Sequence, residues 1–367
     1  MVLRNRDLTR ASSELRSGGA PPADTLYDGD AVLKVKDLEV EYRGRDVQTA
    51  AVRGIGLTLR AGRIVGMAGE SGSGKSASAL AIMGLLPPGT RVAGSVQYRG
   101  IELLGMTERQ LRSYRGRQLA MIFQETGTAL NPVIRIGEQL TMAARAHFPG
   151  SREELGQRIR DALTDVRLTD HDRVLRSYPH ELSGGMCQRV VIAMALSCGS
   201  QVLLADEPTT ALDVSVQKEI LDLIRFLVTD RQLAVLMISH DLAVLAEVCE
   251  DLIVMYSGEI VESGPADIVL EAPAHPYTRA LLSCLPQLHE AGTLLPELTQ
   301  AAPAPSDRGC RFRTRCPWRA EACETHPELE LLRTADDPRS VRCWRAEEVH
   351  AADAVIRNGS AVKGAQA

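Results

Sequence analysis

A glycine-rich octapeptide has the residue types and spacing of a phosphate-binding loop. Residues 69–76 read Gly-Glu-Ser-Gly-Ser-Gly-Lys-Ser, which fits the P-loop pattern G-x-x-x-x-G-K-[ST]. Glycines let backbone N–H groups close around phosphate oxygens, and the start of the following helix favours an anion. We expect Lys75 to reach the β- and γ-phosphates of ATP and Ser76 to bind Mg²⁺. The residues of this loop predicted to bind ATP are Gly69, Ser71, Gly72, Ser73, Gly74, Lys75 and Ser76.

Two acidic residues directly follow the short hydrophobic run at 202–205. Asp206 can hold Mg²⁺, either directly or through a water molecule. Glu207 is one residue further on, so we expect its side chain on the other side of the strand. There it can polarise a water molecule for attack on the γ-phosphate. A solvated strand end is the alternative, and it is weak in a chain that also carries a phosphate-binding loop.

Two more polar residues follow hydrophobic runs. Gln124 follows residues 119–123 and could touch both Mg²⁺ and the attacking water, and His240, close behind residues 234–238, could bond the γ-phosphate. Taken alone, each is more often a surface or structural residue. The candidate catalytic residues are therefore Lys75, Gln124, Glu207 and His240. The candidate magnesium ligands are Ser76, Gln124 and Asp206.

Two other features could also contact ATP. Ser183 is a good helix N-cap, and Gly184 and Gly185 leave the helix start bare, so this is a second candidate anion site. A plain helix start is the alternative. Tyr42 ends the first predicted strand and could stack on an adenine ring, although a surface tyrosine is nearly as good an interpretation.

Alternating strands and helices are needed to position these residues. The apolar run 64–68 predicts a buried strand before the loop, and the small and aliphatic residues 77–86 predict a helix after it. Alternating apolar and polar residues predict strands at 32–42 and 55–59. Residues 138–177 follow a helical pattern with many charges and predict a helical insertion. Further strands are predicted at 119–123, 202–205, 234–238 and, as a hairpin, at 253–262.

Composition places the chain among ordinary globular proteins. Of 367 residues, 44% are apolar and 24% are charged, and the net charge of −5 argues weakly against nucleic-acid binding. No apolar run approaches the ~20 residues that a membrane span needs. Residues 1–30 lack the apolar core of a signal peptide, so we expect a disordered tail and a cytosolic chain. Its eight cysteines are therefore not expected to form structural disulfides.

The order of these motifs resembles the nucleotide-binding subunit of ABC transporters over about residues 32–290. The phosphate loop, Gln124, Leu182-Ser-Gly-Gly-Met186, Asp206-Glu207 and His240 carry the resemblance. A nearer resemblance is to the oligopeptide/dipeptide/nickel importer ATPases. Its further motifs are Leu130-Asn-Pro132, Tyr178-Pro-His180, Asp206-Glu-Pro-Thr-Thr-Ala-Leu-Asp213 and His275-Pro-Tyr-Thr278.

The resemblance implies an α/β fold: a P-loop NTPase core of the ABC ATPase type, with an antiparallel β subdomain, a helical subdomain and a small C-terminal cysteine-rich tail. The implied nucleotide-binding domain covers residues 31–290, with its helical subdomain at about 125–200. Residues 291–347 would then hold a linker and the cysteine-rich region, and residues 348–367 a disordered tail.

The resemblance also implies function and partners. The chain would bind and hydrolyse ATP with Mg²⁺ to power the import of oligopeptides or dipeptides; nickel or another small solute is the alternative, and a soluble ABC ATPase outside transport is a weaker one. Its partners would be a second ATPase subunit bound head-to-tail, two transmembrane permease subunits and an extracytoplasmic solute-binding protein, with no nucleic acid. The chain would lie peripherally on the cytoplasmic face of the cell membrane, with Gln124 in the coupling loop.

Three positions depart from the family pattern. Met186 ends the signature where ABC proteins at large have glutamine, although methionine is common in this subfamily. Cys187 stands where arginine is usual in the subfamily. Glu125-Thr-Gly127 follows Gln124 where Asp-Pro or Glu-Pro is usual, which affects the expected surface for the membrane subunits.

Four of the eight cysteines, Cys310, Cys316, Cys323 and Cys343, lie in the C-terminal region among several arginines. Four thiolates bind Zn²⁺ or an iron–sulfur cluster, and the spacings of five, six and nineteen residues match no zinc ribbon. The form of this tail resembles importer ATPases that carry a [4Fe–4S] cluster. Zinc and unligated thiols are the alternatives. We expect a structural role, with the P-loop domain able to bind ATP without the cluster.

Overall fold

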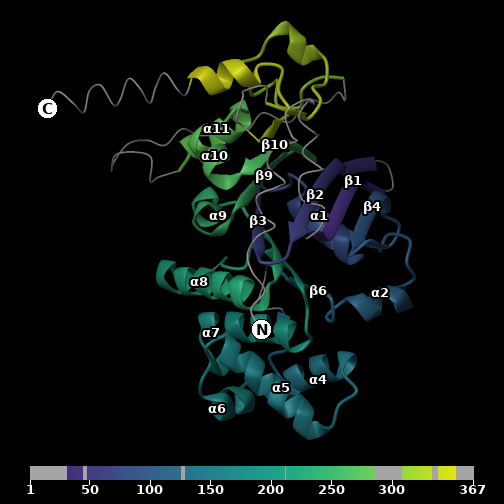
Figure 1. Cartoon of the computed structure of the whole chain (residues 1–367), viewed down its shortest axis with the longest axis vertical. Coiled ribbons are helices and arrows are strands. Elements are labelled where there is room, and N and C mark those ends of the chain that lie inside the picture. The colour runs from purple at the N-terminus through teal and green to yellow at the C-terminus, as the bar shows by residue number, and fades with distance from the viewer. Residues whose placement is uncertain are drawn as a thin grey trace, which may run out of the picture. The chain divides into compact units, whose positions relative to one another are not determined.

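The computed structural model describes residues 31–43, 48–124, 129–210, 212–285, 308–332 and 338–352 (Figure 1). Several expectations lie outside these residues: the tail at 1–30, the linker near 301–306, the unusual segment 125–127 and the end of the chain from 353. In the described part of the chain, no helix is both long enough and apolar enough to cross a membrane.

Eight strands of the described residues form one sheet, in the order β11-β12-β10-β9-β3-β8-β7-β6. Four neighbouring parallel strands form one half of this sheet and end at its β6 edge, and their hydrophobic runs are buried as expected for a sheet covered on both faces. They are β3 (Arg63–Ala68), β8 (Ala234–Ser239), β7 (Val202–Asp206) and β6 (Leu119–Ile122). Because these strands are parallel, the residues that follow them meet at one edge of the sheet.

A second, antiparallel sheet has the order β2-β1-β4-β5. Its strands are β1 (Ala31–Arg43), β2 (Gln48–Arg60), β4 (Arg91–Tyr98) and β5 (Ile101–Glu102). Alternate residues of β1, such as Leu33 and Val35, face a core that also contains apolar residues of helix α1 (Lys75–Met83) and of β3. The helix that follows the P-loop therefore packs between the two sheets (Figure 1). The predicted antiparallel β subdomain is confirmed.

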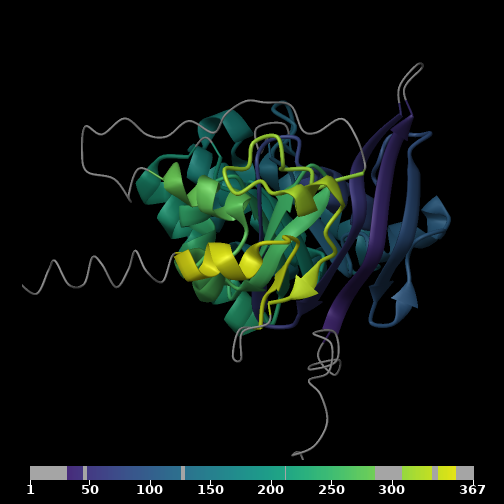
Figure 2. The ribbon, with the colours of Figure 1, turned by 90° about the horizontal axis from the view of Figure 1, so that it is seen from above.

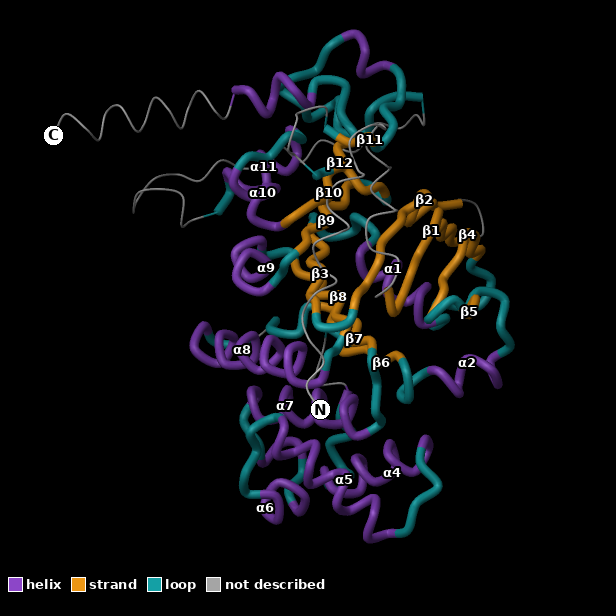
Figure 3. The backbone as a smooth tube through the Cα atoms, viewed as in Figure 1, coloured by secondary structure: helices purple, strands orange, loops and turns teal. Residues whose placement is uncertain are grey.

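Helices make up the region between β6 and β7, as predicted. They are α4 (Ile136–His147), α5 (Arg152–Asp165), α6 (His171–Arg176) and α7 (Gly184–Ser197). They gather at one end of the tube drawing (Figure 3), and α2 (Glu108–Tyr114) lies apart from them. Helix α5 begins with a capping box, in which Ser151 accepts from the backbone N–H of Glu154 and the Glu154 carboxylate accepts from that of Ser151.

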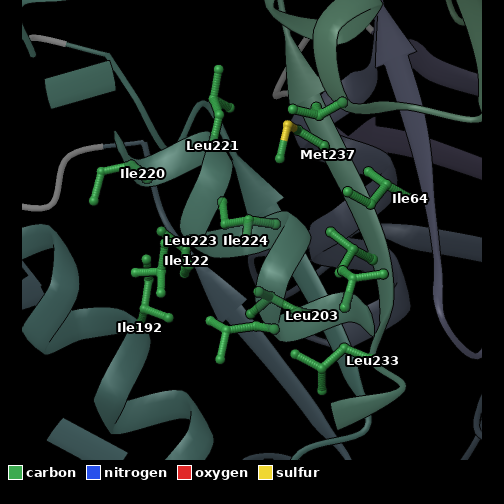
Figure 4. Packing of buried hydrophobic residues seen from close by; sticks show 14 of the residues in the cluster. Ile64, Ile122, Ile192, Leu203, Ile220, Leu221, Leu223, Ile224, Leu233 and Met237 are labelled. Carbon is green, nitrogen blue, oxygen red and sulfur yellow. The ribbon is translucent and has the colours of Figure 1, made fainter. Parts of the chain in front are cut away.

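Helix α8 (Val214–Arg231) joins this helical region to the sheet. Its apolar face, which includes Ile220 and Ile224, packs with Leu203 of β7, Ile122 of β6 and Ile192 of α7 in one core (Figure 4). Asp213 caps its first turn by accepting from the backbone N–H of Val216 at 3.0 Å.

The C-terminal region adds to the P-loop sheet. Helix α9 (Leu242–Val248) precedes the strands β9 (Asp251–Tyr256) and β10 (Glu259–Pro265). Helices α10 (Ala266–Glu271) and α11 (Pro276–Ser283) follow them. The short strands β11 (Glu330–Leu331) and β12 (Ser340–Val341) then extend the sheet beside β10. Figure 2 shows this late segment beside the β9–β10 hairpin. Residues 346–352 are helical, with Val349 buried, and so overlap the tail expected from residue 348.

Two buried ion pairs fasten this region to β10. Arg311 donates to the Glu259 carboxylate at 2.7 Å, and Arg339 donates to that of Glu262 at 3.2 Å. All four side chains are less than a tenth exposed. Removing one member of such a pair would leave a buried, uncompensated charge, so these contacts specify where the C-terminal region docks.

Candidate nucleotide site

The P-loop connects the end of β3 to the start of α1, as the sequence predicts. Lys75 is buried, and its Nζ atom donates to the backbone carbonyls of Gly69 at 2.7 Å and Glu70 at 2.9 Å. Burial lowers the pKa of Lys75, and the negative charges of Glu207, Asp206 and Glu70 oppose that shift. The ammonium group therefore lies inside the loop, at the place where a phosphate would be enclosed.

Two glycines of the loop are required by close backbone contacts. At Gly69, a Cβ atom would lie 2.3 Å from the carbonyl oxygen of Met255. At Gly74, where φ is 106°, it would lie 2.4 Å from the carbonyl oxygen of Ala51. Gly72 has open space around the position of a Cβ atom, and both it and Ser71 are exposed. The loop is thus held tightly at its two ends and is open at its tip.

Asp206 and Ser76 have the chemistry of a magnesium site. Asp206 is 5% exposed, and its Oδ1 atom has no hydrogen-bond partner among the described residues. Burial raises the pKa of Asp206, and a hydrogen bond with Ser76 opposes that shift. Mg²⁺ is usually held by one or two carboxylates together with substrate phosphates, and an orphaned buried carboxylate oxygen beside a hydroxyl fits this pattern.

Three of the predicted catalytic residues meet through the Glu207 carboxylate. Nδ1 of His240 lies 2.9 Å from its Oε1 atom, and Nε2 of Gln124 donates to its Oε2 atom, also at 2.9 Å. Thr210, which the sequence analysis did not single out, donates to Oε2 at 2.9 Å. In the sequence, only its position in the motif 206–213, after β7, pointed to a role for Thr210 at this site. We call Glu207, Gln124, His240 and Thr210 the glutamate cluster.

The Glu207 side chain is oriented by its backbone rather than by strand alternation. Strand β7 ends at Asp206, and Glu207 has a φ of 48°, in the left-handed region that non-glycine residues rarely adopt. Glu207 therefore lies beyond the strand, so alternation along β7 does not set the direction of its side chain. Burial alone would raise the pKa of Glu207, but hydrogen bonds from His240 and Thr210 more than offset it, so the carboxylate's pKa lies below its usual value.

The signature segment forms a helix start, as predicted. Ser183 caps α7 by accepting from the backbone N–H of Met186 at 3.3 Å, and both Ser183 and Gly184 are exposed. Gly185 is buried, and a Cβ atom there would lie 2.5 Å from Cγ1 of Val216 in α8. The exposed residues leave this helix start accessible to another molecule, and the buried glycine allows α7 to approach α8.

Tyr42 lies at the end of β1, opposite Thr49 of β2, and is half-buried. Strand β2 approaches the P-loop directly, since the Ala51 carbonyl oxygen would meet a Cβ atom at Gly74. Tyr42 therefore belongs to the strand pair that borders the phosphate loop.

The four C-terminal thiols lie near one another but do not form a site for a single metal ion. Burial, together with the three neighbouring thiols, raises the pKa of Cys343 to about 12. Cys310 and Cys323 are also joined by a backbone hydrogen bond of 3.0 Å. Across the described residues, no group of three or more His, Cys, Asp or Glu side chains could hold a metal ion. The geometry therefore gives the iron–sulfur expectation no direct support.

Comparison with known proteins agrees with the motifs. Residues 52–210 match the ABC transporter family, and residues 261–323 match the family described as "Oligopeptide/dipeptide transporter, C-terminal region". A probable peptide ABC transporter ATP-binding protein of Sinorhizobium fredii is 42% identical over 91% of this chain and 99% of its own length. The oligopeptide transport ATP-binding protein OppD of Salmonella typhimurium is 42% identical over 87% of this chain and 94% of its own.

A solved structure shows the same core. The dimeric bacterial ABC transporter cassette MJ0796 has a TM-score of 0.57 and 28% identity, and the match covers 64% of this chain and 98% of that one. The chain therefore belongs to the ATP-binding proteins of ABC transporters, in the oligopeptide/dipeptide group, and is an ATPase.

Proposed function

We propose that this ATPase powers the uptake of oligopeptides or dipeptides across the cell membrane. The match of residues 261–323 to the oligopeptide/dipeptide C-terminal region carries the proposal, and two relatives described as peptide transport proteins support it. The chain acts at the cytoplasmic face of the membrane, bound to two permease subunits. A solute-binding protein outside the membrane delivers the peptide.

Hydrolysis follows from the groups around the P-loop. Backbone N–H groups and Lys75 bind the β- and γ-phosphates. Asp206 and Ser76 would hold Mg²⁺, which would offset the negative charge of the phosphates. Glu207 remains ionised at neutral pH and accepts a hydrogen bond from the attacking water, which it orients towards the γ-phosphate. His240 bonds the γ-phosphate, and Tyr42 stacks on the adenine ring.

A second ATPase subunit completes each site. Ser183 and Gly184 are exposed at the start of α7, and the N–H groups of a helix start attract anions. One chain has no need of two phosphate cradles for one ATP. In a head-to-tail dimer, the signature helix of one subunit covers the γ-phosphate in the P-loop of the other, so that ATP closes the dimer and hydrolysis reopens it.

The coupling surface lies around Gln124. Phe123 and Val133, on either side of residues 125–128, are 43% and 78% exposed, and Met142 of α4 is 63% exposed. Exposed apolar side chains are the kind of surface that a protein partner can cover. We place the permease subunits here, where they reach the glutamate cluster through Gln124.

The four cysteines bind a [4Fe–4S] cluster in this proposal. The donor set fits, because backbone N–H groups two residues further on donate to the sulfurs of Cys310, Cys316 and Cys343, and such bonds stabilise metal-bound thiolates. The four irons of a cluster also hold their cysteine ligands further apart than a single ion does. Around one zinc ion, Zn–S bonds of about 2.3 Å bring the four sulfurs close together. The cluster would stabilise the fold of this region.

Anaerobically purified protein tests the cluster. It should be brown and contain iron and inorganic sulfide, and Cys316→Ser should lose both. The matched control is Cys284→Ser, since Cys284 is half-buried outside the four-cysteine group. Stoichiometric zinc in a colourless protein would show that the site binds a single ion instead, and metal-free protein would refute both forms of the site.

Reconstitution tests the cargo. The chain is placed in vesicles with its permease subunits, second ATPase subunit and binding protein, and the uptake of labelled tripeptide, dipeptide and nickel is compared. ATP-dependent uptake of peptide alone is the expected result. Uptake of nickel alone would refute peptide import while leaving the ATPase assignment intact.

A further inference from the structure

The C-terminal region contacts the P-loop directly through one arginine. Arg315 makes a bidentate ion pair with Glu70, the second residue of the loop, with N–O distances of 2.9 and 2.7 Å. The Arg315 side chain is 7% exposed and that of Glu70 is 33% exposed, so the pair is largely shielded from water. Paired hydrogen bonds of this kind fix geometry as well as charge. The tail therefore contacts the phosphate loop, a contact that the sequence analysis did not predict.

Aromatic residues hold the arginine in place. Its guanidinium carbon lies 5.6 Å from the ring centre of Tyr256 and 5.7 Å from that of Phe312, within the range of cation–π attraction. Phe312 and Tyr256 also pack against Tyr277. The Tyr277 hydroxyl in turn accepts from the backbone N–H of Glu70 at 2.9 Å. Arg315 thus holds the side chain of Glu70 and Tyr277 holds its backbone, although both residues lie more than 200 positions further along the chain.

The position of Glu70 determines the shape of the phosphate loop. Its carbonyl oxygen accepts from Nζ of Lys75 at 2.9 Å and from the backbone N–H of Ser73 at 3.1 Å. When Lys75 turns to a phosphate, the contacts from Arg315 and Tyr277 still hold Glu70. The ion pair also neutralises a carboxylate beside the triphosphate site, where an unpaired negative charge would oppose ATP binding.

We propose that Arg315 is a positioning residue for ATP binding, which acts through Glu70, and that the C-terminal region is thereby part of the nucleotide site. The proposal uses only the ATPase activity and does not depend on the cargo or on the metal content. Arg315 directly precedes Cys316, so this arginine lies within the four-cysteine segment.

Nucleotide affinity in a double-mutant cycle tests the proposal. Mg-ATP dissociation constants are measured for the full chain and for Arg315→Met, Glu70→Gln and the double variant. Loss of a charge-assisted hydrogen bond should weaken binding by roughly tenfold in Arg315→Met. In the Glu70→Gln background the same substitution should change the constant by about twofold or less, because no carboxylate is left unpaired. Arg319→Met, which removes an exposed ion pair with Glu324, is the control and should bind as the parent does.

Two results of this cycle would overturn the proposal. A parental dissociation constant in Arg315→Met would overturn the proposal and leave Arg315 a purely structural residue, whose substitution lowers thermal stability without changing affinity. An equal loss of affinity in both backgrounds would also overturn it, because the effect would then not act through Glu70. If Arg315→Met does not fold, Arg315→Lys takes its place in the same cycle. Lysine keeps the charge but not the paired geometry, so a smaller loss that still depends on Glu70 supports the proposal, and a loss independent of Glu70 refutes it.

Discussion

The proposed mechanism of hydrolysis depends most directly on Glu207. This residue accepts hydrogen bonds from Gln124 and Thr210, its Oε1 atom lies 2.9 Å from Nδ1 of His240, and its backbone adopts a left-handed conformation. Backbone strain of this kind persists only where surrounding contacts enforce it, and it gathers at functional sites. The left-handed conformation and the hydrogen bonds together fix the direction of one carboxylate.

Glu207→Gln should reduce turnover by at least about a hundredfold while leaving the affinity for ATP close to that of the parent. The amide keeps the shape of the side chain but cannot accept a proton from water. Phosphate release and nucleotide binding are measured in parallel, with Glu153→Gln on the exposed start of α5 as the control. Parental turnover in Glu207→Gln would show that another group activates water.

Thr210→Val should shift the acid limb of the turnover profile to higher pH. The Thr210 hydrogen bond helps to hold the pKa of Glu207 below its usual value, so its removal raises that pKa and less of the carboxylate is ionised at a given acidic pH. Valine has nearly the same shape as threonine, so packing is conserved. The check is the profile of kcat from neutral pH down to about pH 3, which includes the acid limb of a carboxylate with a lowered pKa. An unshifted acid limb would show that Glu207 does not set it.

At the scale of elements, the C-terminal region docks through buried ion pairs on a strand of the ATPase sheet. Arg339 lies on the segment that enters β12, and its partner Glu262 lies on β10, both fully buried. The Glu262 carboxylate also accepts from the backbone N–H groups of Ala274 and His275 at 2.8 and 3.0 Å. Burial raises the pKa of Glu262, and these contacts, with Arg339, oppose that shift.

Arg339→Met should destabilise the fold by about 3 kcal/mol, because it leaves the Glu262 carboxylate buried without its counter-charge. The destabilisation should be smaller at low pH, where the unpaired carboxyl group can take up a proton. Thermal and urea unfolding measure the effect. Arg112→Met, which removes an exposed pair with Glu108, should change stability little, and an equal effect of the two substitutions would contradict the argument.

At the scale of the whole molecule, the sequence predicts the catalytic edge well. The hydrophobic runs of β6, β7 and β8 identify them as buried strands, and parallel neighbours bring the residues after them to one edge. The sequence therefore predicts one shared site for Gln124, Glu207 and His240. Phosphate-loop residues are equally recognisable, because their backbone geometry admits few residue types.

The contacts of the C-terminal region could not be predicted in this way. Arg315 and Glu70 are separated by 245 positions, and no periodic pattern connects them. Strands β11 and β12 have two residues each, too few for alternation to identify a strand. Thr210 was overlooked because a hydroxyl acquires its role only from the carboxylate that it contacts. Such features depend on tertiary placement rather than on local pattern.

The most direct test of the account is ATP turnover per chain in the isolated protein and in the assembled transporter. In the proposed dimer, the site is complete only when the signature helix of a second subunit meets the P-loop. We therefore predict slow hydrolysis by dilute, monomeric chain, fast hydrolysis in the assembled complex, and loss of the fast rate in Glu207→Gln. Vigorous hydrolysis by a strictly monomeric sample, at the rate of the complex, would contradict the account.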